Sequence, residues 1–267
     1  MKRITILLLV SSVLLSSKPV HFRHADSQLT KDYVYVPAPA LGDFYISSIE
    51  VTNQQYRDFL NDLKAKGKTD LLKIAMVDSI RWLTVVKNST AFADYYFQHS
   101  AYSSYPVVNV SKEAAQLYCD WLTERIKAQS SEAKIHFALP TEAQWCSAAK
   151  AGNANAIYPW EGESIACEKK GKLYKTNLCN YNINGLANAS SDESKEVDIT
   201  APSKSYLPNK FNIYNMSGNV AEMVADQNYV VGGSWHSTAE KMKIGSHESI
   251  SVPNPTVGFR PVMIVEK

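Results

Sequence analysis

Apolar and polar residues alternate in two short segments of the N-terminal part of the chain. Residues 33–37 read Tyr-Val-Tyr-Val-Pro and residues 44–46 read Phe-Tyr-Ile. Alternation with a period of two predicts β-strands, with one side chain in two facing the core. A third short strand is predicted at residues 107–110, Val-Val-Asn-Val. The sheet that these strands predict is built from very short elements.

Three other segments repeat their apolar residues with the period of a helix. The first begins at Thr52 and the third at Thr141, each with a glutamine three residues later, a capping-box pattern. The second begins after Ser111, and the third ends at Gly152. The predicted buried faces of the first two helices are Tyr56, Phe59, Leu60 and Leu63, and Ala115, Tyr118, Cys119 and Leu122.

The rest of the chain carries no long periodic pattern. Residues 65–105 are irregular and rich in Tyr and Ser, and no helical period follows Gly152. Loops of this length inside a domain are unusual, but aromatic residues spread along them indicate that they are packed. These residues are Trp160, Tyr174, Tyr181, Tyr206 and Tyr214. The pattern therefore predicts an α+β domain that is rich in coil.

Composition adds the size and charge of the molecule. The 267 residues are 45% hydrophobic and 20% charged, which suits a globular domain with a normal core. The net charge is only +2, so global electrostatics argue neither for nucleic acid nor for an anionic membrane as a partner. Any partner has to be inferred from a local site.

The N-terminus has the pattern of a secretory signal. Met1-Lys-Arg precedes an apolar run from Ile4 to Leu15, which is too short to span a bilayer. We expect residues 1–25 to be a signal peptide and frayed terminus and residues 26–267 to be one domain, periplasmic or secreted. The run could instead be an N-terminal core element. No Cys lies near residue 20, which excludes a lipid anchor at the cleavage site.

Four cysteines are present, and their spacing matches no metal site. Cys167 and Cys179 flank a Lys-rich loop and could close it as a disulfide in an oxidising compartment. Cys119 and Cys146 lie in apolar helical patterns, so we interpret them as buried thiols, with a bridge as the alternative.

Eight short phrases stand out along the sequence. They are Ile49-Glu-Val-Thr-Asn53, Tyr105-Pro-Val-Val-Asn-Val-Ser111, Tyr118-Cys-Asp-Trp121, Leu139-Pro-Thr-Glu-Ala-Gln-Trp145, Tyr158-Pro-Trp160, Gly218-Asn-Val-Ala-Glu222, Gly232-Gly-Ser-Trp235 and Gly258-Phe-Arg260. Taken in order, these phrases resemble the sulfatase-modifying-factor family, which includes the formylglycine-generating enzymes. The resemblance implies a coil-rich variant of the C-type lectin fold. The details around His99 and Ser217 look most like the branch of gliding and secretion-machinery lipoproteins.

The resemblance implies a copper site that this chain lacks. Aerobic formylglycine-generating enzymes hold copper with two cysteines placed two and seven residues after the aromatic of the Gly-Gly-Ser-aromatic phrase. Counted in the same way from Trp235, these positions are Ser237 and Met242. A hydroxyl is a poor ligand for soft Cu(I), and one thioether does not replace two thiolates. We therefore expect no copper cofactor and no oxidase activity of that kind.

The resemblance also implies structural calcium. The corresponding ligands are backbone carbonyls of Ser217, Gly218 and Val220 with the Glu222 carboxylate, a donor set that suits calcium. In the alternative, Glu222 caps the turn or pairs with Arg260. A possible second calcium site would use Asn180 and Tyr181 with a loop around Asp198.

We expect a noncatalytic exported module that binds a protein, peptide or glycan of the cell envelope, with no nucleic-acid partner and no membrane span. Its expected binding surface contains Trp235, His236, His247 and Arg260. One alternative is an enzyme with a different centre, such as iron, that uses His236, His247, Glu240 or Glu248. Another is a hypervariable receptor with the same lectin-like fold.

Overall fold

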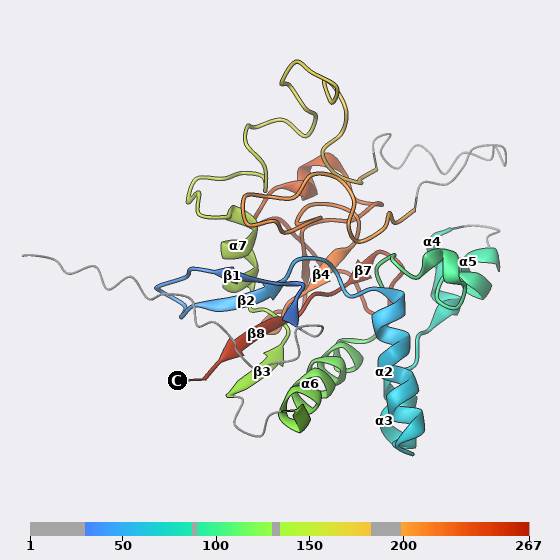
Figure 1. The fold of residues 1–267 in the computed structure, drawn as a ribbon. Helices are drawn as coiled ribbons and strands as arrows, with labels where there is room; N and C mark the ends of the chain where they lie inside the picture. Colours follow the sequence, from blue (N-terminus) through green and yellow to red (C-terminus); the bar gives the residue numbers. More distant parts are fainter. Residues whose placement is uncertain (1–29, 87–89, 130–133, 183–198, 267) are drawn as a thin grey trace, which may run out of the picture.

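The computed structural model describes residues 30–86, 90–129, 134–182 and 199–266 (Figure 1). Within these residues there are two four-stranded sheets. The first is antiparallel and has the order β1-β2-β8-β3, formed by Tyr33–Val36, Phe44–Ser47, Val262–Val265 and Ile135–Ala138. The second has the order β6-β5-β4-β7, formed by His247–Glu248, Val230–Val231, Ala221–Met223 and Val257–Gly258. In the second sheet, β4 and β7 run parallel.

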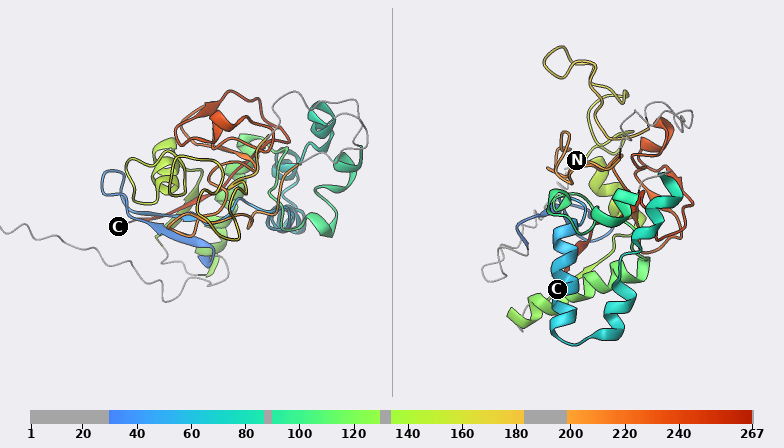
Figure 2. Two further views of the ribbon diagram at one scale, coloured as in Figure 1. Left: turned by 90° about the horizontal axis from the view of Figure 1, so that it is seen from above. Right: turned by 90° about the vertical axis from the view of Figure 1, so that its right-hand side faces the viewer.

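The first sheet separates two layers of the core. Alternate side chains point to opposite faces of a strand, so each strand contributes to both layers. Helix α6 lies on one face and α7 on the other (Figures 1 and 2). The α6 face carries Tyr33, Tyr45, Phe137 and Met263, and the α7 face carries Val34, Val36, Phe44, Ile46, Val262 and Ile264.

Three helices match the sequence predictions. They are α2 (Asn53–Ala65), α6 (Lys112–Gln129) and α7 (Glu142–Lys150). The two capping boxes are present, since the side chains of Thr52 and Thr141 each accept from the backbone N–H three residues on, and Gln55 and Gln144 accept in return. Ser111 caps α6, because its Oγ accepts from Ala114 N at 3.0 Å. These ends are determined by local sequence.

The irregular stretch before residue 105 folds into a chain of short helices (Figure 1). They are α3 (Thr69–Ala75), η1 (Ser79–Arg81), α4 (Trp82–Val85), α5 (Thr90–Tyr95) and η2 (Ser100–Tyr102). Their aromatic residues form a third cluster with the C-terminal part of the chain, in which Trp82 stacks at 6.2 Å on Trp235. The loop before Pro106 is ordered by the same kind of packing, since the Tyr102 ring contacts those of Tyr96 and Tyr105.

The predicted strand at Val107–Val110 is wrong. Val107 N donates to Val51 O and Asn109 N donates to Asn254 O, so the segment pairs with two different partners and extends no ladder. Asn109 has a φ of 61°, in the left-handed region, which ends the extended conformation. The apolar side chains of Val107, Val108 and Val110 are nevertheless buried.

All four cysteines are free in the structure, so the possible Cys167–Cys179 disulfide is not formed. Cys179 is buried beside Tyr158 and Met242, whereas Cys167 Sγ contacts the carbonyl of Lys169 at 3.7 Å. Cys119 is fully buried among aromatic residues, as predicted. Cys146 is only partly buried. The predicted signal peptide lies outside the described residues.

A close contact between backbones organises the coil-rich part. Gly218 has a φ of 77°, and a Cβ there would overlap the carbonyl oxygen of Asn180. Asn219 N donates to the same oxygen at 2.8 Å. Only glycine allows both the left-handed backbone and this approach. The contact fixes the 216–222 segment against the segment that ends at Asn182.

Gly218→Ala is expected to destabilise the chain more than Gly245→Ala. Gly245 has a similar φ of 87°, but a Cβ there meets nothing within 4 Å. Both variants carry the strain of an L-residue in the left-handed region, roughly 1–2 kcal/mol. Overlap with Asn180 adds about 1–3 kcal/mol for Gly218→Ala alone. Urea unfolding of the two variants measures the difference, and equal destabilisation would contradict the close contact.

Candidate functional site

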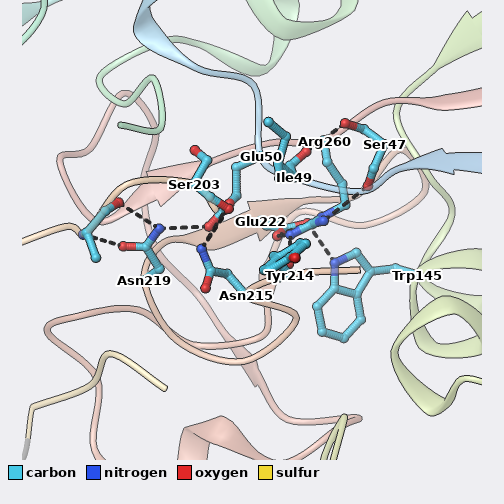
Figure 3. A network of polar contacts seen from close by, with 11 residues as sticks. Ser47, Ile49, Glu50, Trp145, Ser203, Tyr214, Asn215, Asn219, Glu222 and Arg260 are labelled. Carbon is cyan, nitrogen blue, oxygen red and sulfur yellow. Dashed lines mark hydrogen bonds and ion pairs between the residues drawn. The ribbon is translucent and has the colours of Figure 1, made fainter. Parts of the chain in front are cut away.

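A buried ion pair joins Glu222, in the second sheet, to Arg260, which follows β7 (Figure 3). Glu222 is in β4, and the parallel pairing of Glu222 with Gly258 in β7 places Arg260 beside it. Arg260 Nε donates to both carboxylate oxygens, at 2.9 and 2.7 Å, and Nη2 donates to Oε1 at 2.6 Å. Their side chains are 0% and 1% exposed. Charge-assisted bonds of this kind are strong and directional.

Both partners of the pair have further hydrogen bonds (Figure 3). Trp145 Nε1, from α7, donates to Glu222 Oε2 at 2.8 Å. Arg260 also donates to the carbonyl of Ser47 at 3.1 Å and to that of Tyr214 at 2.9 Å. Burial acts to lower the pKa of Arg260, but the Glu222 carboxylate outweighs it and raises that pKa. The pair therefore joins the first sheet, α7, the coil and the second sheet.

A second carboxylate, that of Glu50, is fully buried next to this pair. Asn219 Nδ2 donates to Oε1 at 2.8 Å and Asn215 Nδ2 donates to Oε2 at 3.2 Å. Burial raises the pKa of Glu50 to about 7; Arg260 acts to lower it and Glu222 adds to the increase. Arg260 thus interacts with two carboxylates: it forms hydrogen bonds with Glu222, and its charge acts on Glu50 without a hydrogen bond between them in the described residues.

The Asn219 side chain joins the two regions that were predicted to hold calcium. Its Oδ1 accepts from Ala201 N at 2.7 Å, and its Nδ2 donates to Ala201 O at 3.2 Å. Asn180 Nδ2 donates to Ile199 O at 2.8 Å. The structure therefore brings Asn180 close to the 217–222 segment through direct hydrogen bonds. Asp198, the third residue of the possible second site, lies outside the described residues.

The side-chain geometry at Glu222 does not fit calcium. Calcium needs six to eight oxygen donors, at least one of them normally a carboxylate. Both oxygens of Glu222 already accept from Arg260 or Trp145, and a cation at this carboxylate would face the Arg260 charge. The arrangement matches the alternative given above, in which Glu222 pairs with Arg260. Calcium bound by Ser217, Gly218, Val220 and Glu222 stays a prediction that this geometry does not favour.

The two positions counted as copper ligands have different surroundings. Ser237 Oγ donates to Glu248 Oε1 at 2.6 Å and lies 2.9 Å from Ser234 Oγ. Met242 is 0% exposed and packs against Gly233, in a cluster with Tyr158 and Cys179. One position is a hydroxyl in a polar network and the other is a core thioether. Neither resembles a thiolate copper site.

The predicted binding surface is wrong for two of its four residues. Trp235 is buried, with Nε1 donating to Pro255 O, and Arg260 is the buried partner of Glu222. His236 and His247 are exposed, but they pack on different rings, Trp235 and Tyr229 respectively. No group of three or more metal-ligating residues occurs within the described part of the chain.

Sequence reasoning missed several members of the network. Glu50 lies between Ile49 and Val51, and a Glu between two apolar residues is the pattern of an outward-facing strand position, so the local sequence does not indicate its burial. Asn215 and Asn219 both have a positive φ, which asparagine tolerates better than most residues. The contact of Trp145 with Glu222 spans 77 positions and leaves no local signal.

The arrangement agrees with the comparison against known families. The sequence pattern of the sulfatase-modifying factor enzyme 1-like domain matches residues 21–264. The chain belongs to this family. Its phrases at Gly218–Glu222, Gly232–Trp235 and Gly258–Arg260 surround the buried ion pair. The placement in the branch of gliding and secretion lipoproteins finds no support among the relatives found.

Relatives include active and inactive enzymes by name. The formylglycine-generating enzyme of Thermomonospora curvata is 32% identical over 135 residues, 51% of this chain and 37% of that protein. The mouse enzyme is 25% identical over 205 residues, 68% and 49% of the two chains. The bovine inactive C-alpha-formylglycine-generating enzyme 2 is 24% identical over 230 residues, 74% and 67%. The chain spans less than half of the first two relatives.

Two solved structures have the same fold. CarF superposes with a TM-score of 0.54 at 20% identity, covering 84% of this chain and 87% of CarF. PvdO from Pseudomonas aeruginosa gives 0.54 at 19% identity, covering 86% and 90%. The predicted coil-rich α+β fold of the formylglycine-generating type is thus confirmed. Among the described residues, no helix has the length and apolar character needed to cross a membrane.

Glu222→Gln is expected to lower the free energy of unfolding by about 3–5 kcal/mol, since it leaves the Arg260 charge buried without its partner. The matched control is Glu266→Gln, because Glu266 pairs with His136 at the surface, where its side chain is 63% exposed. That change should stay within about 0.5 kcal/mol. Urea unfolding measures both variants, and similar values would contradict a central role for the pair.

Glu50 is expected to make the folded chain more stable at lower pH. Its pKa is raised in the folded state, from 4.5 to about 7. The stabilisation is fully present below the unfolded pKa and is lost as pH rises through about 7, an effect of roughly 3 kcal/mol. Glu50→Gln should flatten this part of the profile, measured by urea unfolding between those pH values. A variant profile as steep as that of the original chain would refute the assignment.

Proposed function

We propose that this chain is an exported, noncatalytic binding or scaffold module of its family. The single observation that supports this most is the pair of residues at the copper-ligand positions, Ser237 and Met242. Oxygen activation by the family's route needs two thiolates on copper, and this chain offers a hydroxyl and a thioether there. The fold alone does not determine whether a member is catalytic.

The two most deeply buried thiols of the chain, those of Cys119 and Cys179, are poor substitutes for the missing copper ligands. A thiolate is the form that binds metal, and burial raises the pKa of the Cys119 thiol well above its usual range. Burial also raises the pKa of Cys179 to about 12. These two thiols therefore stay protonated at neutral pH. Burial and protonation therefore make Cys119 and Cys179 poor copper ligands, and neither lies at a position that the copper count singles out.

The relatives are consistent with loss of activity within this fold. The bovine protein named as inactive matches over 74% of this chain, more than either of the formylglycine-generating enzymes described above. That name describes a relative of this chain as inactive, which is a precedent for a member of the family without catalytic activity. The buried hydrogen bonds around Glu222 stabilise the fold, and this role does not require any of their residues to react with a substrate.

The partner that we propose is a protein, peptide or glycan met after export, in a periplasm or outside the cell. The N-terminal pattern of residues 1–25 supports export. The branch of gliding and secretion lipoproteins remains a proposal that rests on the phrases around His99 and Ser217. Exposed His236 and His247 remain candidates for contact with the partner.

The proposal is tested with a cysteine-containing sulfatase peptide, Cu(I) and oxygen, with aldehyde detected by hydrazide labelling. We expect no aldehyde above the protein-free control. Formation of aldehyde by the unmodified chain would overturn the proposal.

A double variant tests the two positions themselves. Ser237→Cys with Met242→Cys should bind Cu(I) more tightly than the original chain, because it supplies two thiolates. The matched control is Ser246→Cys with Met76→Cys, two changes at positions that the copper count does not single out. Equal copper binding by the two double variants would show that Ser237 and Met242 do not correspond to the copper positions, whatever the activity.

A further inference from the structure

A two-stranded loop carries a dense group of lysines away from the body of the molecule (Figures 1 and 2). Leu178 N donates to Ile165 O at 3.0 Å, Cys167 N to Thr176 O at 2.9 Å and Lys175 N to Cys167 O at 2.8 Å. These bonds tie the two sides of the loop together. Residues 168–175 form its tip, which we call the lysine tip.

The lysine tip carries a positive charge that the small net charge of the whole chain does not reveal. Its sequence, Glu-Lys-Lys-Gly-Lys-Leu-Tyr-Lys, has four Lys and one Glu, a net charge of +3. The whole chain has a net charge of +2, so all other residues together sum to −1. The positive charge is therefore local, and it acts over a distance of about 10 Å at moderate salt.

Few acidic groups neutralise these lysines. Lys169 Nζ lies 3.1 Å from Glu161, which also pairs with Lys210 at 3.1 Å. Within the described residues, Lys170, Lys172 and Lys175 form no ion pair. The Lys175 ammonium lies 5.4 Å from the centre of the Tyr174 ring. Exposed ion pairs such as that of Lys169 contribute little, so all four ammonium groups remain available to a partner.

Apolar side chains accompany the charge. Leu173 and Tyr174, within the lysine tip, are 42% and 47% exposed. Tyr206 and Leu207 are 41% and 55% exposed, and they line a small hollow with Trp160 and Leu178, near the base of the loop. Leu173 and Tyr174 are thus adjacent exposed side chains with Lys172 before them and Lys175 after them. Apolar side chains accompanied by Lys are also what segments that bind at a membrane surface present to it.

We propose that the lysine tip docks the exported chain onto an anionic lipid surface. The lysines attract acidic headgroups, and Leu173 and Tyr174 enter the interface, where Tyr is favoured. An acidic polysaccharide satisfies the same lysines but offers no apolar phase for Leu173. The lipid surface therefore accounts for both features of the tip. Docking in this way is peripheral and reversible, and it is independent of whether the chain catalyses a reaction.

The test is co-sedimentation of the full chain with phosphatidylcholine vesicles that either contain or lack phosphatidylglycerol. We expect binding only to the vesicles with the acidic lipid, and weaker binding as salt is raised. Changing Lys169, Lys170, Lys172 and Lys175 to Gln should weaken binding at least about thirtyfold. The matched control changes four exposed lysines elsewhere, Lys64, Lys73, Lys127 and Lys243, to Gln. Any contribution from the N-terminal residues is common to all variants.

Two further measurements separate a lipid surface from a soluble polyanion. Leu173→Ser with Tyr174→Ser should weaken vesicle binding about tenfold, since it removes the apolar groups. The same double variant should leave binding to polygalacturonate unchanged. Equal binding of the tip and control lysine variants to vesicles would overturn the proposal. So would binding to polygalacturonate in the absence of any binding to vesicles, which would assign the tip to an acidic glycan.

Discussion

The buried pair of Arg260 and Glu222 is the interaction on which the rest of the structure depends. Arg260 is completely buried, and its donors reach β4, the carbonyl of Ser47 at the end of β2 and the carbonyl of Tyr214 in the coil. A fold with very short strands has few ladder hydrogen bonds to hold its segments together. A buried guanidinium with several donors in fixed directions replaces part of those missing hydrogen bonds, provided that each donor has an acceptor.

The same pair explains the polar residues around it. Glu50 lies in the field of Arg260 but contacts the amides of Asn215 and Asn219, so burial dominates and its pKa rises to about 7. The asparagines turn the chain with a positive φ and also supply donors to this carboxylate. Side-chain amides therefore satisfy buried carboxylates and carbonyls in this region by direct hydrogen bonds.

The sequence predicts helices and strands most reliably where the residues that determine them lie within one element. The capping boxes at Thr52 and Thr141 and the alternation at Tyr33–Val36 depend on residues within one element. The strand at Val107–Val110 failed because Asn109 takes a left-handed φ, which its apolar neighbours do not reveal. The pairing of Glu222 with Arg260, 38 positions apart, is only one of several alternatives in the sequence, since it depends on the parallel pairing of β4 with β7. Trp235 was misplaced on the surface because its burial depends on Trp82, far away in sequence.

Direct hydrogen bonds from Arg260 and Trp145 occupy both oxygens of Glu222, and they hold this region together without requiring a cation there. The most direct measurement is thermal unfolding of the purified chain in chelator and again with excess calcium. Anything that binds only the folded state raises the melting temperature. We expect the same melting temperature in both conditions. A higher melting temperature in calcium that disappears in Glu222→Gln would contradict this expectation and restore the calcium site.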